Sequence, residues 1–160
     1  MATSYSLNLR ISEAEAAVKE AVEAGLIACG ITLEGQIVKN ITQSKLVDEG
    51  RLRSSITYKT KTQKGTSDLN SVPNDNEVII GTNLKYAPYV EFGTGIFAEG
   101  GGGRKTPWIY YYDGHKGKKG FRFTRGMKPQ AFMRKAFDQW RNKMQQVFSV
   151  SFKKVMDSKK

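Results

Sequence analysis

The sequence predicts an α+β fold with a long N-terminal helix, a small antiparallel sheet of about four strands and an amphipathic C-terminal helix. Apolar residues recur at spacings of three and four in residues 12–41 and again in residues 130–152, which is the period of a helix. Between these segments, short runs rich in Val, Ile, Thr and aromatic residues are bounded by Gly, Asn, Asp and Pro, as strands are. A chain of 160 residues can bury one core, so we expect residues 1–160 to form a single domain.

The N-terminal helix is predicted to start at a capping box, in which Ser12 precedes Glu15 by three residues. An apolar stripe then continues along one side as far as Ile41. Three glycines interrupt the helix and either allow close packing against a partner helix or mark a bend. These glycines are Gly25, Gly30 and Gly35.

Cysteine usage and hydropathy indicate where the protein is made. Cys29 is the only cysteine, which excludes an internal disulfide and favours a reducing compartment. Residues 1–11 lack a basic start followed by an apolar run, and the charge-free apolar run at 24–33 is too short to cross a bilayer. We therefore expect a soluble protein made in a cytoplasm, without membrane contact.

The middle of the chain is predicted to hold the strands, at residues 56–64, 77–83, 108–112 and 121–124. Because the last two strands flank a stretch of glycines and lysines, residues 108–125 are predicted to form a hairpin with a basic tip. The loop before it, residues 93–107, contains six glycines and is expected to be mobile in the free protein. Pro129 introduces the final helix, whose apolar stripe from Phe132 to Phe152 is expected to face the core.

Residues 86–92, Tyr-Ala-Pro-Tyr-Val-Glu-Phe, form a compact motif that we call the aromatic knuckle. Pro88 is preset for the first position of a helix, so one short helical turn is predicted here, ended by Gly93 in a left-handed conformation. The rings either fill the core of the chain itself or meet another subunit, since Tyr and Phe favour interface cores. On the second interpretation, the subunit interface comprises Tyr86, Tyr89, Glu91, Phe92, Gly93, Thr94 and Gly95.

The sequence carries no recognisable catalytic, cofactor-binding or metal site. The only histidine, His115, lies among glycines and lysines in the predicted hairpin tip, so Ser-His-Asp or Cys-His mechanisms lack a base in a suitable setting. One Cys and one His cannot supply the usual set of zinc ligands. The glycine run at 100–103 lacks the lysine of a phosphate loop, and the adjacent Asp48 and Glu49 have no obvious acidic partner. We expect no enzyme activity and no cofactor.

Positive charge is concentrated in the second part of the chain. Residues 1–100 hold 10 basic and 12 acidic side chains, whereas residues 101–160 hold 16 basic and 3 acidic ones. This asymmetry indicates a polyanion or an acidic protein surface nearby, or else a solvated basic surface. Residues that would contact a polyanion or a partner, without reading base sequence, are Lys116, Lys118, Lys119, Arg122 and Arg125. Phe121 and Phe123 share one face of a strand and are expected to belong to the core.

Three segments of the chain are similar to the neck and tail-completion protein family of long-tailed bacteriophages and prophages. They are Asp48-Glu-Gly-Arg-Leu-Arg-Ser-Ser-Ile56, then Ile80-Gly-Thr-Asn83 with the knuckle and Gly93-Thr-Gly95, then Gly126-Met-Lys-Pro-Gln-Ala-Phe132 with Ala136-Phe137. Their order and spacing agree with the family from about residue 10 to residue 155. Two features differ from the family pattern. Glu49 replaces the usual Thr, and residues 96–125 look like an insert that is longer and more basic than the family core requires.

The resemblance implies a structural subunit of the head–tail connector, without catalytic residues, that assembles as a ring joining capsid and tail. The ring is expected to be hexameric and to lie at the head–tail junction of the virion, after synthesis in the bacterial cytoplasm. The implied partners are other copies of the chain, head-closure or connector proteins, and tail-terminator or tail-tube proteins, with non-specific contact to packaged DNA. The alternative, drawn from charge alone, is a non-specific nucleic-acid-binding protein that uses the basic second half.

Overall fold

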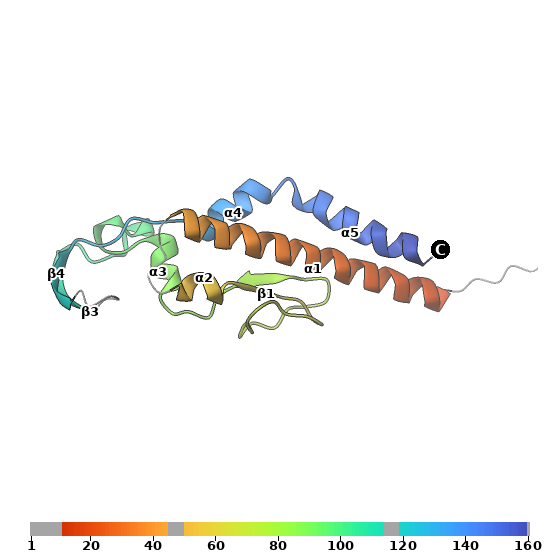
Figure 1. Ribbon diagram of the computed structural model, residues 1–160. Helices are drawn as coiled ribbons and strands as arrows, with labels where there is room; N and C mark the ends of the chain where they lie inside the picture. The colour runs from red at the N-terminus through yellow and green to blue at the C-terminus, as the bar shows by residue number, and fades with distance from the viewer. Residues whose placement is uncertain (1–10, 45–49, 114–118, 160) are drawn as a thin grey trace, which may run out of the picture.

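The structure is a computed structural model that describes residues 11–44, 50–113 and 119–159, and its architecture is the predicted mixture of helices and antiparallel strands. The longest element is α1 (Ile11–Gln43), which runs without interruption through all three of its glycines (Figure 1). Since α1 is already helical at Ile11, Ser12 lies inside the helix and is not its cap.

Two of the glycines in α1 permit close packing, which is one of the two roles predicted for them. A Cβ atom added at Gly25 would lie 2.5 Å from the ring of Phe148, and one added at Gly30 would lie 2.7 Å from the ring of Tyr58. An added Cβ at Gly35 would meet no atom within 4 Å. The first two positions therefore let neighbouring rings approach the helix backbone, whereas Gly35 has no such neighbour.

Helix α1 is sandwiched between two groups of elements (Figure 1). The C-terminal helices α4 (Phe132–Trp140) and α5 (Met144–Ser158) lie along one side. On the other side lie α2 (Arg51–Ser55) and β1 (Thr57–Lys59). Because the helix is covered on two sides, its buried positions do not fall on one narrow stripe.

By length and composition alone, α1 could cross a membrane. In this fold it contacts α4, α5, α2, β1 and β2 (Ile79–Gly81), and eight of its residues between Ala21 and Ile41 are buried. The apolar character of the helix is accounted for by its place at the centre of the molecule.

The four predicted strands are present, but they form two separate two-stranded sheets instead of one. Strand β1 pairs antiparallel with β2, with Tyr58 opposite Ile80. Strand β3 (Trp108–Asp113) pairs antiparallel with β4 (Lys119–Thr124), which confirms the predicted hairpin. Chain segments next to the hairpin hold it at one end of the elongated molecule, away from β1 and β2 (Figure 1).

The predicted final helix is divided at residues 141–143 into α4 and α5, which both pack on α1. Asn40 of α1 donates a hydrogen bond from Nδ2 to the carbonyl of Phe132 at 3.1 Å, and Trp140 Nε1 donates to Gln36 Oε1 at 3.1 Å. The hydrophobic core lies around the fully buried Phe132, and its other buried members are Ile37, Ile41, Leu52, Ile56, Ala87 and Ala136. Residues from α1, α2, α3 (Ala87–Phe92) and α4 therefore share one core.

Candidate functional site: the junction of the aromatic knuckle, α4 and the hairpin

The aromatic knuckle forms the predicted short helix, α3, with Pro88 in its first turn. Its inward positions are Ala87 and Glu91, which are 4% and 5% exposed. Its aromatic rings point outward: Tyr86 is 42%, Tyr89 62% and Phe92 48% exposed. The rings do not fill the core of the subunit, so they are available as a contact surface.

Glu91 is the buried acid of the site, and it caps helix α4. Its carboxylate accepts hydrogen bonds from the backbone N–H groups of Met133, at 3.0 Å, and Arg134, at 3.1 Å. These two N–H groups belong to the first turn of α4, where a helix has no internal partner for them. The local cap position is Ala131, which has φ 50° and no side chain able to accept a hydrogen bond. Glu91, which is distant in sequence, therefore supplies the N-terminal cap that Ala131 cannot provide.

Arg134 connects α4 to two carboxylates and a ring. Its Nε donates to Glu91 Oε1 at 3.1 Å, and its other guanidinium nitrogens lie 2.8 Å from the carboxylate oxygens of Glu99. The guanidinium also lies over the ring of Phe92, 5.2 Å from the centroid. Glu99 first, and then Glu91, raise the pKa of Arg134 above its usual value. The pairing thus holds the exposed Phe92 ring in a fixed position beside α4.

The segment Gly93-Thr-Gly95, directly after the knuckle, crosses the segment that leaves the hairpin, and the two backbones touch. The N–H of Thr94 donates to the carbonyl of Met127 at 2.8 Å, and the N–H of Met127 donates back to Thr94 Oγ1 at 2.9 Å. A Cβ on Gly95 would lie 2.0 Å from the carbonyl oxygen of Arg125, and one on Gly126 2.0 Å from that of Thr94. We call this contact the glycine crossing. Only residues without a side chain allow it.

The predicted glycine-rich loop begins with ordered turns. Gly93 ends the helix, but the predicted left-handed conformation is wrong: its φ is 77° and its ψ is 175°, a combination that also favours glycine. Two short 3-10 turns follow, at Gly95–Phe97 and Glu99–Gly101. The mobility expected for residues 93–107 in the free protein stays a prediction.

An apolar groove lies between α3, α4 and the turn after β2. Its volume is about 450 Å³. The apolar side chains on its wall are Leu84, Pro88, Phe92, Met133 and Phe137. The Glu91–Arg134 contact closes one part of the wall and fixes α3 against α4. The groove therefore combines a mainly apolar wall with the Glu91–Arg134 ion pair.

The hairpin carries the described part of the predicted polyanion site. Arg122 and Arg125 are exposed, Lys119 pairs with Asp113 at 2.9 Å, and Lys116 and Lys118, like His115, lie outside the described residues. The guanidinium of Arg122 lies 4.1 Å from the centroid of the Tyr112 ring. Contact with a polyanion stays a prediction.

The expectation that Phe121 and Phe123 belong to the core is wrong. Phe121 is 79% and Phe123 65% exposed. The pattern of the strand correctly places both rings on one face, but among the described elements none packs extensively against the hairpin.

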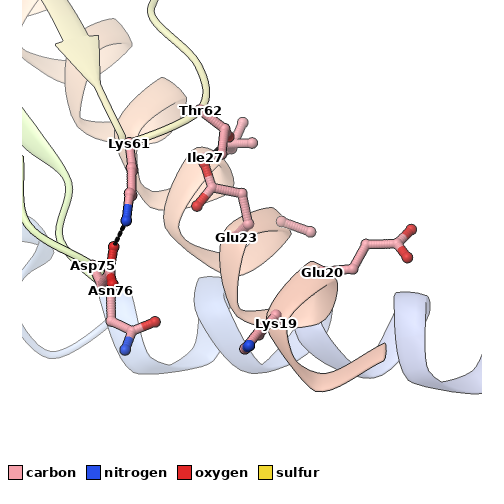
Figure 2. Close-up of a pocket in the computed structure, with 9 residues that line it drawn as sticks. Lys19, Glu20, Glu23, Ile27, Lys61, Thr62, Asp75 and Asn76 are labelled. Atoms are coloured by element: carbon pink, nitrogen blue, oxygen red, sulfur yellow. Dashed lines mark hydrogen bonds and ion pairs between the residues drawn. The ribbon is translucent and has the colours of Figure 1, made fainter. Parts of the chain in front are cut away.

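A separate pocket between α1 and the loops after β1 is lined by several charged side chains, namely Lys19, Glu20, Glu23, Lys61 and Asp75 (Figure 2). Its volume is about 600 Å³. Lys61 pairs there with Asp75, Glu23 accepts hydrogen bonds from the Thr60 and Thr62 hydroxyls, and Glu20 pairs with Lys159 at 2.8 Å. Residues 11–44, 50–113 and 119–159 contain no group of three or more His, Cys, Asp or Glu side chains that could hold a metal ion. These carboxylates serve the fold.

The three motif segments that resemble a known family meet at one place. Ser55 Oγ and Thr82 Oγ1 are 2.7 Å apart and join the first segment to the second. Glu91 and the glycine crossing join the second to the third. Asp48 and Glu49, at the start of the first segment, lie outside the described residues. The motifs thus describe a junction that holds helices together and presents aromatic side chains.

Sequence reasoning missed the capping role of Glu91, which was grouped with the interface residues. Within the subunit, Glu91, Gly93 and Gly95 are buried and Thr94 is half-buried, so the structure of the chain itself already uses them. One signal was present: the final helix begins after Pro-Gln-Ala, without a Ser, Thr, Asp or Asn to cap it. Whether these residues also meet another subunit stays a prediction.

The structure is a small α+β subunit whose motifs hold helices together and expose aromatic rings. Exposed aromatic rings of this kind are typical of proteins that bind other proteins. The chain belongs to the HK97-gp10-like family, described as "Bacteriophage HK97-gp10, putative tail-component", which matches residues 6–93. It is thus a member of a family of structural phage tail components, consistent with the neck and tail-completion resemblance. The match includes α1, the first motif segment, the second as far as Gly93, and α3, whereas the hairpin and α4 lie beyond it. No curated protein and no solved structure matches the chain.

Proposed function

We propose that this chain is a non-enzymatic structural subunit of the phage head–tail connector, a neck or tail-completion protein that assembles as a ring. The ring joins capsid and tail, and we expect it to be hexameric. Its neighbours are a head-closure or connector protein on one side and a tail-terminator or tail-tube protein on the other. The subunit acts in the virion, at the head–tail junction.

The observation that carries this proposal is the outward direction of the aromatic knuckle on a rigid base. Tyr86, Tyr89 and Phe92 expose large rings although the helix that bears them is fixed by the buried Glu91. Tyr and Phe in such positions are typical of the centre of protein interfaces. Membership of a family of phage tail components makes other virion proteins the natural partners.

The proposal is tested with a phage that lacks the gene for this protein. We expect cells infected by this phage to accumulate filled heads and separate tails. Purified protein added to an extract of these cells should join the heads to the tails. Tyr89→Ser with Phe92→Ser should reduce joining, while Val72→Ser, at an 83% exposed position outside the knuckle, should not. Normal tailed particles without the protein would contradict the proposal.

The alternative function is non-specific binding of nucleic acid. Exposed Arg122 and Arg125 on the hairpin and the net charge of +11 favour it. Binding of this type rests on phosphate contacts and weakens steeply as salt rises from about 50 to 200 mM. If Lys116→Ala, Lys118→Ala and Lys119→Ala together abolish DNA retention yet leave head–tail joining intact, DNA contact is a separate property. If they block joining, the hairpin serves the connector.

A further inference from the structure

The β3–β4 hairpin, which we call the arm, has one face made of large apolar side chains. Ile109 is paired with Phe123, and Tyr111 with Phe121, so all four side chains lie on the same face. They are 67%, 65%, 55% and 79% exposed, in that order. Tyr111 and Phe121 contact each other edge to face, with ring centroids 5.4 Å apart. Four adjacent apolar side chains of this size mark a contact surface.

The rest of the chain does not cover this face. The arm lies at one end of the molecule, beyond α3 (Figure 1). In the described parts of the chain, β3 and β4 pack on each other and have no extensive contact with another helix or strand. A two-stranded hairpin is marginally stable in water by itself, and a third element on its apolar face would stabilise it.

The α3–α4 groove offers the complementary surface. It is lined by Pro88, Phe92, Met133 and Phe137, and it is held open by Glu91, which fixes the start of α4. The rings of Phe92 and Phe137 are 48% and 44% exposed at its edge. An apolar face and an apolar groove thus both lack a partner within one subunit.

Within the described residues, neither β3 nor β4 makes an extensive contact with α3 or α4, the helices that line the groove of the same chain. The glycine crossing ties both ends of the arm's base together, since the N–H of Ile96 donates to the carbonyl of Arg125 at 3.0 Å beside the Thr94–Met127 contact. At Gly95 and at Gly126 the two backbones lie so close that an added Cβ would be 2.0 Å from a carbonyl oxygen of the facing segment, so the base of the arm is tightly packed. The groove is therefore available to an arm from a second copy.

The area of the arm's apolar face agrees with a specific contact. A large aromatic side chain has about 150–250 Å² of surface. Four side chains that are more than half exposed therefore offer roughly 500 Å². Covering them removes a similar area from the partner, about 1,000 Å² in total, which is at the lower end for specific interfaces. In a ring, each copy makes this contact twice.

We propose that the apolar face of the arm of one copy docks into the α3–α4 groove of the next copy. The proposal rests on the proposed ring and identifies the contact that builds it. Because the arm and the groove are different surfaces, the contact is head to tail and propagates until the ring closes. The opposite face of the arm, which carries Arg122 stacked on Tyr112, stays free in this arrangement.

A cross-linking experiment tests the contact directly. Lys119→Cys, beside the apolar face of the arm, and Asp138→Cys, which follows Phe137 in α4, leave the apolar side chains of the contact in place. They are combined in a Cys29→Ser chain, assembled on heads or tails and treated with a short bismaleimide. The expected result is a ladder of covalent multimers that ends at the ring size. Lys119→Cys combined with Val72→Cys is the matched control and should give no ladder. A cross-link confined within single chains, or equal ladders from both pairs, would overturn the docking.

Mixing two defective variants tests its direction. Phe121→Ser with Phe123→Ser removes the arm surface, and Phe92→Ser with Phe137→Ser removes the groove surface, in residues that are all exposed. Each variant alone should associate at least about tenfold more weakly than the wild type. The mixture should recover dimers but not rings, since only one intact arm and one intact groove can meet. Thermal melts check that both variants fold.

The outcomes separate this inference from the proposed function. If the arm variant forms normal rings, or the mixture gives no dimers, the docking is wrong while the connector function stands. If the arm variant loses only DNA retention and assembles normally, the arm binds nucleic acid instead. If the wild-type chain itself never assembles on heads or tails, the proposed function fails and the docking fails with it.

Discussion

The carboxylate of Glu91 holds Arg134 at two points, accepting hydrogen bonds from its backbone N–H and from its Nε, each at 3.1 Å. Glu91 belongs to the aromatic knuckle, and Arg134 to the first turn of α4. This contact joins the segment that presents the exposed rings to the helix that packs on α1. The exposed surface is therefore as rigid as the core behind it.

The first prediction concerns this buried acid. Glu91→Ala should lower the free energy of unfolding by about 3 kcal/mol, because the first turn of α4 loses its cap and buried N–H groups lose their acceptor. Glu91→Gln keeps an acceptor oxygen and should have a smaller effect. Urea unfolding of the purified protein measures both.

Glu99→Ala is the matched control, because Glu99 also pairs with Arg134 but its side chain is 40% exposed. An exposed pair contributes less than about 1 kcal/mol. Equal losses for Glu91→Ala and Glu99→Ala would show that burial of Glu91 does not matter, contrary to the structure.

The three glycines of α1 should respond differently to alanine. Gly25→Ala and Gly30→Ala force the rings of Phe148 and Tyr58 away from the helix and should each destabilise the protein by about 1–3 kcal/mol. Gly35→Ala meets no neighbour and should stabilise it by up to about 1 kcal/mol through helix propensity. Thermal unfolding followed by circular dichroism would test the order. A stabilising Gly30→Ala would contradict the packing of β1 on α1.

The thiol of Cys29 should react slowly with maleimide in the folded protein. It is 8% exposed at the α1–α5 contact, where its Sγ lies 3.7 Å from the carbonyl oxygen of Met144, and burial raises the pKa of the thiol. Both effects lower the thiolate fraction available to a reagent. Maleimide labelling should become fast only in denaturant, whereas a cysteine placed at exposed Val72 should react at once. Rapid labelling of native Cys29 would mean that α5 does not stay packed on α1.

Two carboxyl groups should have pKa values shifted in opposite directions from their usual values. Hydrogen bonds from Lys59 and then Lys64 lower the pKa of Asp68, whereas burial raises the pKa of Glu34. The contribution of Asp68 to stability is present above its unfolded pKa and is lost as pH falls through its folded pKa. The stability that protonated Glu34 provides is present below its unfolded pKa and is lost as pH rises through its folded pKa.

A carboxyl-detected NMR titration measures both pKa values in one sample. Asp68 should have its midpoint below that of an ordinary aspartate and Glu34 above that of an ordinary glutamate. Lys64→Met should move the Asp68 midpoint toward its usual value and leave that of Glu34 unchanged. Coincident, unshifted midpoints would contradict the contacts of the loop after β1.

Local patterns predicted most elements of the fold. The helical period of the first forty residues identified α1, since a helix at the centre of a small domain must place apolar residues toward its neighbours. Glycines and lysines between two aromatic runs identified the β3–β4 hairpin, because such residues suit a tight turn. The alanine-proline pair identified α3 for a similar local reason.

Long-range relationships could not be predicted in the same way. Alternation placed Phe121 and Phe123 on one face, but it does not tell whether the chain or a partner covers that face. The pairing of the strands in two separate sheets and the close contact between Gly95 and Gly126 join segments far apart in the sequence, which no local period reveals. The capping role of Glu91 could not be predicted, because it depends on contact with α4, which lies far along the chain.

Electron microscopy of heads and tails mixed with the purified protein tests the connector function most directly. With the wild-type protein, joined particles should carry one additional ring of density at the junction, and none should form in its absence. Heads and tails that join equally well without the protein, with no ring bound to either part, would contradict the connector function.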